Sequence, residues 1–102
     1  MNKNLILSAA VGYNFKQVEF FIKSLRKHYL DNVCFIIGYQ DNDLAVSLKK
    51  YNCDIIKTKV NKNKIQFKRY EIFSKYLDNK KFNNILLCDS RDIYFQNDPF
   101  NF

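Results

Sequence analysis

The sequence predicts an α/β fold of Rossmann-like type, in which a mostly parallel sheet carries helices on both faces. Four short apolar runs alternate along the chain with segments whose apolar residues recur at helical spacing. The first run, residues 4–11, is continuously apolar, which is typical of a strand buried on both faces of a sheet. Parallel strands joined through helices have right-handed crossovers, so a ligand is expected at the carboxyl ends of the strands.

The first predicted strand leads into an amphipathic helix. Gly12 ends residues 4–11, and residues 15–29 then place apolar side chains on one side at helical spacing. The side chains expected to face the core are Val18, Phe21, Ile22, Leu25 and Tyr29. Those expected to face solvent are Lys16, Glu19, Lys23 and Lys27.

A second strand and a second helix follow. Residues 33–39 are rich in β-forming residues. The short carboxylates of Asp41 and Asp43 suit the amino terminus of a helix. The apolar residues expected along that helix are Leu44, Val46, Leu48 and Tyr51.

The last predicted elements are a strand, a loop, a helix and a strand. Residues 53–58 form the third strand, and residues 59–64, rich in lysine and asparagine, form a loop. Helical spacing resumes over residues 65–77, and residues 83–88 form the fourth strand. The first and fourth strands end in the most distinctive chemistry, and in a doubly wound sheet these two ends can face one crevice.

The composition indicates one globular domain over residues 1–102. Of the 102 residues, 47% are hydrophobic and 17% aromatic, which suffices for a modest core. No signal sequence precedes the first strand, and no apolar stretch approaches the ~18 residues of a membrane span. Cys34, Cys53 and Cys88 are widely spaced, which favours free, buried thiols over disulfides or a zinc site. Free thiols fit a reducing compartment, so a cytoplasmic location is expected.

The chain is basic, with a formal net charge of +7. Most lysines are spread along the sequence, but one run is formed by Lys57, Lys59, Lys62, Lys64 and Lys68. This run lacks the arginine-rich, glycine-rich or aromatic-interleaved pattern of a nucleic-acid-binding segment. We interpret it as a solvated basic face, and no nucleic-acid partner is predicted.

The most informative stretch is the end of the fourth strand. Residues 85–88 lead directly into two carboxylates, Asp89 and Asp92. Hard divalent cations such as Mg²⁺ and Mn²⁺ prefer oxygen ligands, and a cation held by one or two carboxylates commonly bridges to substrate phosphates. The pattern therefore suggests a bound nucleotide. The alternative is a simple turn, in which both side chains bond to nearby backbone donors.

The same stretch resembles the DxD-type motif of glycosyltransferases of the GT-A fold. The closest pattern reads Asp-x-Arg-Asp, then apolar residues, Phe-Gln and Asp-Pro-Phe, and it matches Asp89, Arg91, Asp92, Phe95, Gln96, Asp98, Pro99 and Phe100. Asp89 and Asp92 are three apart rather than two, unlike a simple DxD. The resemblance implies a nucleotide-diphospho-sugar transferase that uses Mn²⁺ or Mg²⁺. It implies that Asp92 binds the metal directly, while Asp89 contacts the donor ribose or a metal-bound water.

The resemblance extends to two other places in the chain. In GT-A domains the end of the first strand receives the base and ribose, which points to Ala9, Ala10 and Tyr13, with Tyr13 as a stacking partner. The alternative is that the two alanines merely allow close helix packing. A basic residue near the start of the third helix faces the nucleotide in similar enzymes, and Arg69 is the better candidate because its planar fork can grip phosphate. A solvated helix face is the alternative for Arg69.

Two further parts of the motif are expected to have structural roles. Arg91 lies between the two acids and is expected to hold the turn together by an ion pair. Residues 98–100 are expected to form a turn with an anchoring aromatic ring, because proline fixes its own φ and biases the residue before it towards extended geometry.

The resulting hypothesis is a glycosyltransferase represented by its amino-terminal, donor-binding half, with the GT-A-like domain incomplete at its carboxyl end. It would transfer a sugar from a nucleotide-sugar donor to an acceptor that the sequence leaves open as a glycan, a protein or a lipid. One alternative is a non-catalytic nucleotide- or phosphate-binding module, and another is a structural α/β interaction domain. A nucleotidyltransferase of related topology is a further alternative, but such enzymes usually carry a glycine-rich phosphate loop, which Gly12 alone does not provide.

Overall fold

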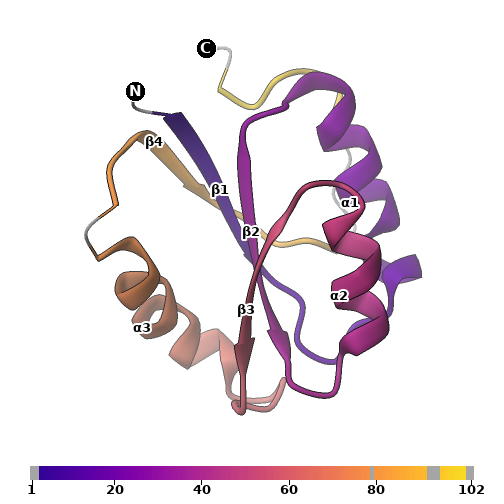
Figure 1. The fold of residues 1–102 in the computed structure, drawn as a ribbon, viewed down its shortest axis with the longest axis vertical. Coiled ribbons are helices and arrows are strands. Elements are labelled where there is room, and N and C mark those ends of the chain that lie inside the picture. The colour runs from indigo at the N-terminus through magenta and orange to yellow at the C-terminus, as the bar shows by residue number, and fades with distance from the viewer. Residues whose placement is uncertain (1–2, 79, 92–94, 101–102) are drawn as a thin grey trace.

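A computed structural model describes residues 3–78, 80–91 and 95–100 of the chain, and it contains one parallel sheet of four strands. The strands are β1 (Lys3–Ala9), β2 (Asn32–Gly38), β3 (Asp54–Thr58) and β4 (Phe82–Leu87). The helices that connect them are α1 (Phe15–His28), α2 (Asn42–Lys49) and α3 (Ile65–Leu77). The predicted α/β, Rossmann-like class is confirmed (Figure 1).

The strand order in the sheet is β3-β2-β1-β4, and every pairing is parallel. The chain moves outward from β1 to β2 and β3, then returns through α3 to place β4 on the free side of β1. This reversal makes the carboxyl ends of β1 and β4 the topological switch point of the sheet. Open α/β sheets bind ligands at that point.

Both faces of the sheet are covered, as the continuous apolar run of the first strand predicted. Helices α1 and α2 lie on one face and α3 lies on the other (Figure 1). Because side chains alternate along a strand, Ile6 packs under α1 while Leu5 and Leu7 pack under α3. All three are almost completely buried.

Helix α1 matches its predicted bounds to within one residue and buries the predicted stripe. Its start is marked by a capping box, in which the Asn14 side chain accepts from the Gln17 N–H at 3.1 Å and the Gln17 side chain accepts from the Asn14 N–H at 3.0 Å. Phe21 is the centre of this face, with its ring edge-on to Phe35 in the sheet. The helix therefore anchors the turn that precedes it to the core.

Helix α2 differs from its prediction in two respects, and the first is that Tyr51 was expected along the helix but lies beyond its last residue, Lys49. Val46 was expected along the apolar side but is 58% exposed, and Ala45 is buried in its place. With α2 running from Asn42 to Lys49, the residues that face the sheet are Leu44, Ala45 and Leu48. The spacing i, i+1, i+4 excludes Val46, which lies on the outward side of the helix.

The segment that follows the acidic motif packs back against α1. The Phe95 N–H donates to the Ser24 hydroxyl at 2.9 Å, and the Phe95 ring meets Phe21 edge-on. Asp98 accepts from the Phe100 N–H at 2.9 Å, and the Phe100 ring packs on Tyr29. The structure thus contains the predicted turn, with Phe100 as the anchoring ring. None of the helices in the described part of the chain is long and apolar enough to cross a membrane.

Candidate functional site

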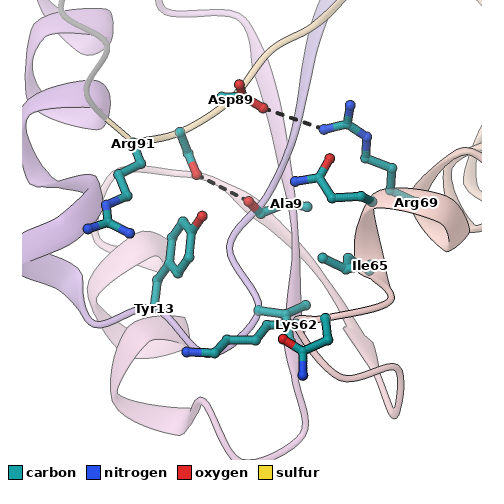
Figure 2. Close-up of a pocket in the computed structure, with 11 residues that line it drawn as sticks. Ala9, Tyr13, Lys62, Ile65, Arg69, Asp89 and Arg91 are labelled. Carbon is teal, nitrogen blue, oxygen red and sulfur yellow. Dashed lines mark hydrogen bonds and ion pairs between the residues drawn. The ribbon is translucent and has the colours of Figure 1, made fainter.

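A pocket of about 260 Å³ lies at the switch point of the sheet (Figure 2). Four of the predicted site residues line it: Ala9, Tyr13, Arg69 and Asp89. They come from the end of β1, the turn before α1, the first turns of α3 and the segment after β4. The topology therefore brings together residues that are up to 80 positions apart in the sequence.

The two other predicted site residues are Ala10 and Asp92. Ala10 does not line the pocket, because its side chain is completely buried in the core beneath α1. Asp92 lies outside the described residues, so its predicted role as the direct metal ligand stays a prediction.

Serine hydroxyls fasten the ends of β1 and β4 together. Ser8 donates to the Cys88 carbonyl at 2.7 Å, and Ser90 donates to the Ala9 carbonyl at 3.2 Å. Ser90 is buried, whereas the adjacent Asp89 side chain is 73% exposed. These bonds hold the carboxylate of Asp89 at the rim of the pocket, where a ligand can reach it.

Asp89 faces Arg69 across the rim (Figure 2). The Arg69 Nη1 lies 3.5 Å from the Asp89 Oδ1, which is a long ion pair. The Arg69 guanidinium lies over the Tyr70 ring, 5.1 Å from its centroid, and its Nη2 donates to the Tyr70 hydroxyl at 3.3 Å. Tyr70 therefore supports Arg69 independently of Asp89.

Arg91 makes a contact that its sequence position does not reveal. Its guanidinium lies over the Tyr13 ring, 5.9 Å from the centroid, and points away from Asp89 (Figure 2). Within the described residues, Asp89 forms its ion pair with Arg69 and not with Arg91. Arg91 and Tyr13 thus line the pocket on the side opposite Arg69, and the aromatic ring of Tyr13 is part of that wall.

Lys62 lines the pocket, and Asp41 fixes the turn beside it, although the sequence predicted only a basic face for Lys62 and a helix start for Asp41. The Lys62 stem lies against Gly12, where an added Cβ would come within 3.3 Å of the Lys62 Cδ. Asp41 accepts from the Gly12 and Gly38 N–H groups, both at 2.8 Å, and makes no side-chain capping bond to α2. One sequence feature could have indicated this role of Asp41. The backbone N–H groups where the chain turns after a strand need hydrogen-bond acceptors, and a carboxylate can supply them.

The charges around the pocket favour an anionic ligand. Three lining side chains are cationic, namely Lys62, Arg69 and Arg91, and Asp89 is the one carboxylate among the described lining residues. A concave surface with an excess of one charge raises the local concentration of oppositely charged ligands. The ring of Tyr13 adds a surface on which a planar group can stack.

A second hollow of about 410 Å³ adjoins the first and shares Tyr13 with it. Its other walls come from the starts of α1 and α2, including Asn14, Phe15, Asp41 and Asp43. It is larger, but its walls come from the segments that follow β1 and β2 rather than from the switch point between β1 and β4, and it contains none of the pocket's three cations. We therefore take the smaller pocket as the candidate site.

The motif implies a divalent cation, which would need oxygen ligands at the pocket. Within the described ranges, no group of three or more His, Cys, Asp or Glu side chains could enclose a metal ion. Mg²⁺ does not require such an enclosure, since it is usually held by one or two carboxylates together with waters and substrate phosphates. The exposed carboxylate of Asp89 fits that arrangement as one ligand.

Comparisons of the chain with protein-family models, with curated proteins and with solved structures find no match. The fold class rests on the observed strand order, and the site rests on the geometry of its own residues.

Proposed function

We propose that this chain forms the donor-binding part of a glycosyltransferase of GT-A type, which transfers a sugar from a nucleoside diphosphate to an acceptor. The observation that carries the proposal is the pocket at the switch point, where an acidic rim, three cations and an aromatic ring meet. A nucleotide-sugar has a planar base, a hydroxyl-bearing ribose and an anionic diphosphate, so each part of the ligand has a chemical counterpart there.

The residues divide this ligand between them. Tyr13 stacks on the base, and the small side chain of Ala9 lets the ligand approach the end of β1. Asp89 accepts hydrogen bonds from ribose hydroxyls or shares the cation, and Arg69 donates to phosphate oxygens through its planar fork. The pocket volume of about 260 Å³ is below the roughly 300–1,000 Å³ of drug-sized sites, so it would hold part of the donor rather than all of it.

A divalent cation would be held by Asp89 and, as the sequence predicts, by Asp92, and it would supply charge neutralisation. When bound, it neutralises the charge that develops on the departing nucleoside diphosphate. The side chains of Arg69 and Lys62 add further positive charge to the pocket. Removing either one should weaken diphosphate binding more than it weakens the binding of an uncharged nucleoside.

The test is calorimetric titration of UDP and of GDP into the purified chain, with and without Mn²⁺. Binding that depends on Mn²⁺ is expected for the native chain, and it should be lost in Asp89→Asn and in Asp92→Ala. Losing one charge-assisted contact should weaken binding by about tenfold or more.

Asp78→Asn is the matched control, because Asp78 is an exposed carboxylate that follows α3 and does not line the pocket. It should bind nucleotide as the native chain does. If the folded native chain binds neither nucleotide with Mn²⁺ present, the donor site does not exist and the structural alternative stands.

A further inference from the structure

The ion pair at the rim of the pocket joins two groups that the proposed function uses separately. Among the described residues that line the pocket, Asp89 supplies the carboxylate that would bind a cation, and Arg69 supplies a guanidinium that would bind a phosphate. At 3.5 Å the contact between them is longer than the roughly 2.7–2.9 Å of a strong charge-assisted bond. The Asp89 side chain is also 73% exposed, so water screens the pair and keeps it weak.

Arg69 is held in place by other contacts. Its side chain is only 25% exposed, and the Tyr70 ring and hydroxyl support its guanidinium. Its Nε is buried and has no hydrogen-bond partner among the described residues. An unpaired buried donor is unfavourable, so the contacts of Arg69 among the described residues do not satisfy all of its donors.

We propose that Arg69 and a divalent cation compete for the carboxylate of Asp89, so that the cation releases the Arg69 guanidinium to a phosphate group. This inference rests on the proposed function and adds a coupling between its two ligands. Without the cation, Arg69 neutralises Asp89. With the cation, the carboxylate is occupied and the guanidinium is free for the diphosphate, so each ligand favours the binding of the other.

If Arg69 competes with the cation for Asp89, removing Arg69 changes Mn²⁺ binding even without nucleotide. If Arg69 only contacts phosphate, no such change is expected. Arg69→Met should bind Mn²⁺ more tightly than the native chain when no nucleotide is present, because the competitor for Asp89 is gone. The free Mn²⁺ is measured by electron paramagnetic resonance. An exposed ion pair contributes about 0.2–1 kcal/mol, which corresponds to a gain in Mn²⁺ affinity of up to about fivefold.

Lys62→Met is the matched control, since Lys62 is a cation of the same pocket that lies at the end away from Asp89 (Figure 2). It reports the general effect of removing one positive charge, and its gain should be smaller than that of Arg69→Met. Equal gains in the two variants would reduce the effect to general electrostatics and overturn the competition. No gain in Arg69→Met, or no Mn²⁺ binding while nucleotide still binds, would overturn it too.

A double-mutant cycle on nucleotide binding without metal gives the second test. Asp89→Asn should tighten metal-free binding of UDP or GDP, because it removes a negative charge and also releases Arg69. The gain should be larger when Arg69 is present than in the Arg69→Met background. Equal gains in both backgrounds would contradict the coupling while leaving the donor site intact, whereas absence of nucleotide binding in every form would reject the proposed function itself.

Discussion

At the scale of single residues, the pocket depends on the neighbour that follows each charged group. Ser90 is buried and bonded to the Ala9 carbonyl, which leaves the Asp89 carboxylate on the outward side. Tyr70 lies under the guanidinium of Arg69 and bonds to it. Two charges of opposite sign are thus positioned by uncharged residues, and neither has to rely on the other.

The three cysteines respond to pH through burial. Burial raises the pKa of Cys34 to about 12, that of Cys53 to about 11 and that of Cys88 to about 12, from the ordinary 9.0 of an unfolded thiol. Below pH 9.0 both the folded and the unfolded chain keep the thiol protons. Above it the unfolded chain loses protons that the folded chain retains, so the free energy of unfolding should fall as pH rises from 9.0 towards 11.

Urea unfolding at several pH values between about 8 and about 10.5 measures this dependence. The fall should be shallower in Cys34→Ala, which lacks one of the titrating groups. At about pH 8 the folded chain should react with a thiol reagent far more slowly than the chain in urea. Rapid reaction of Cys34 and Cys53, the two buried thiols, in the folded chain would contradict their burial.

At the scale of elements, one carboxylate links two turns. Asp41 precedes α2 and accepts from Gly12 after β1 and from Gly38 at the end of β2. Gly12 has a φ of +77°, a conformation that favours glycine, and it leaves room for the Lys62 stem. The turn that carries Tyr13 is therefore fixed from the side of β2 as well as from α1.

Asp41→Ala should lower the free energy of unfolding by about 1–3 kcal/mol, because two backbone N–H groups lose a charged acceptor. Asp41→Asn retains one side-chain oxygen and should lose less. The comparison is made by chemical denaturation, with Asp43→Asn as the control because Asp43 is an exposed carboxylate of the same region. An Asp41→Ala variant as stable as the control would show that these bonds contribute little.

At the scale of the whole molecule, one aromatic ring joins three parts of the fold. Phe21 projects from α1, meets Phe35 of β2 at a centroid distance of 5.7 Å, and meets Phe95 of the last segment at 5.3 Å. The helix, the sheet and the segment after the acidic motif therefore share one core. Loss of this ring should loosen all three.

Phe21→Ala should lower the free energy of unfolding by about 3–5 kcal/mol, since truncating a buried aromatic side chain leaves a cavity. Phe20→Ala is the matched control, because Phe20 is the preceding residue of the same helix and is 71% exposed, whereas Phe21 is 1% exposed. The control should change stability by no more than about 0.5 kcal/mol. Comparable losses in the two variants, measured by urea denaturation, would contradict the assigned orientation of α1.

Strand β4, at one edge of the sheet, is partly exposed to solvent. Strand β4 pairs with β1 alone among the described residues, and its Ile85 and Leu87 side chains are each 45% exposed. They continue the apolar face formed by Leu5 and Leu7 beyond the part that α3 covers, because paired residues of parallel strands share a face. The switch-point pocket therefore borders the open edge of the sheet.

The sequence by itself determined the order of the elements and most of their predicted bounds to within one residue, although β1 ends at Ala9, two residues before the predicted end at Val11. The predicted helix over residues 65–77 coincides with α3, and the predicted fourth strand differs from β4 by one residue at each end. Apolar spacing depends on neighbours within a few positions, so it can be read along the chain. It was less reliable for Val46, where a small difference in the phase of a short helix changed which side chain faces the sheet.

Only the tertiary structure decided which residues meet. Ala9 borders the pocket while Ala10 lies in the core, Arg69 pairs with Asp89, and Arg91 lies over Tyr13. These contacts arise because β4 returns to the free side of β1, which brings together side chains far apart in the sequence. Periodicity describes how each element forms but not which strand lies beside it, so the sequence predicted the candidates and the strand order selected their partners.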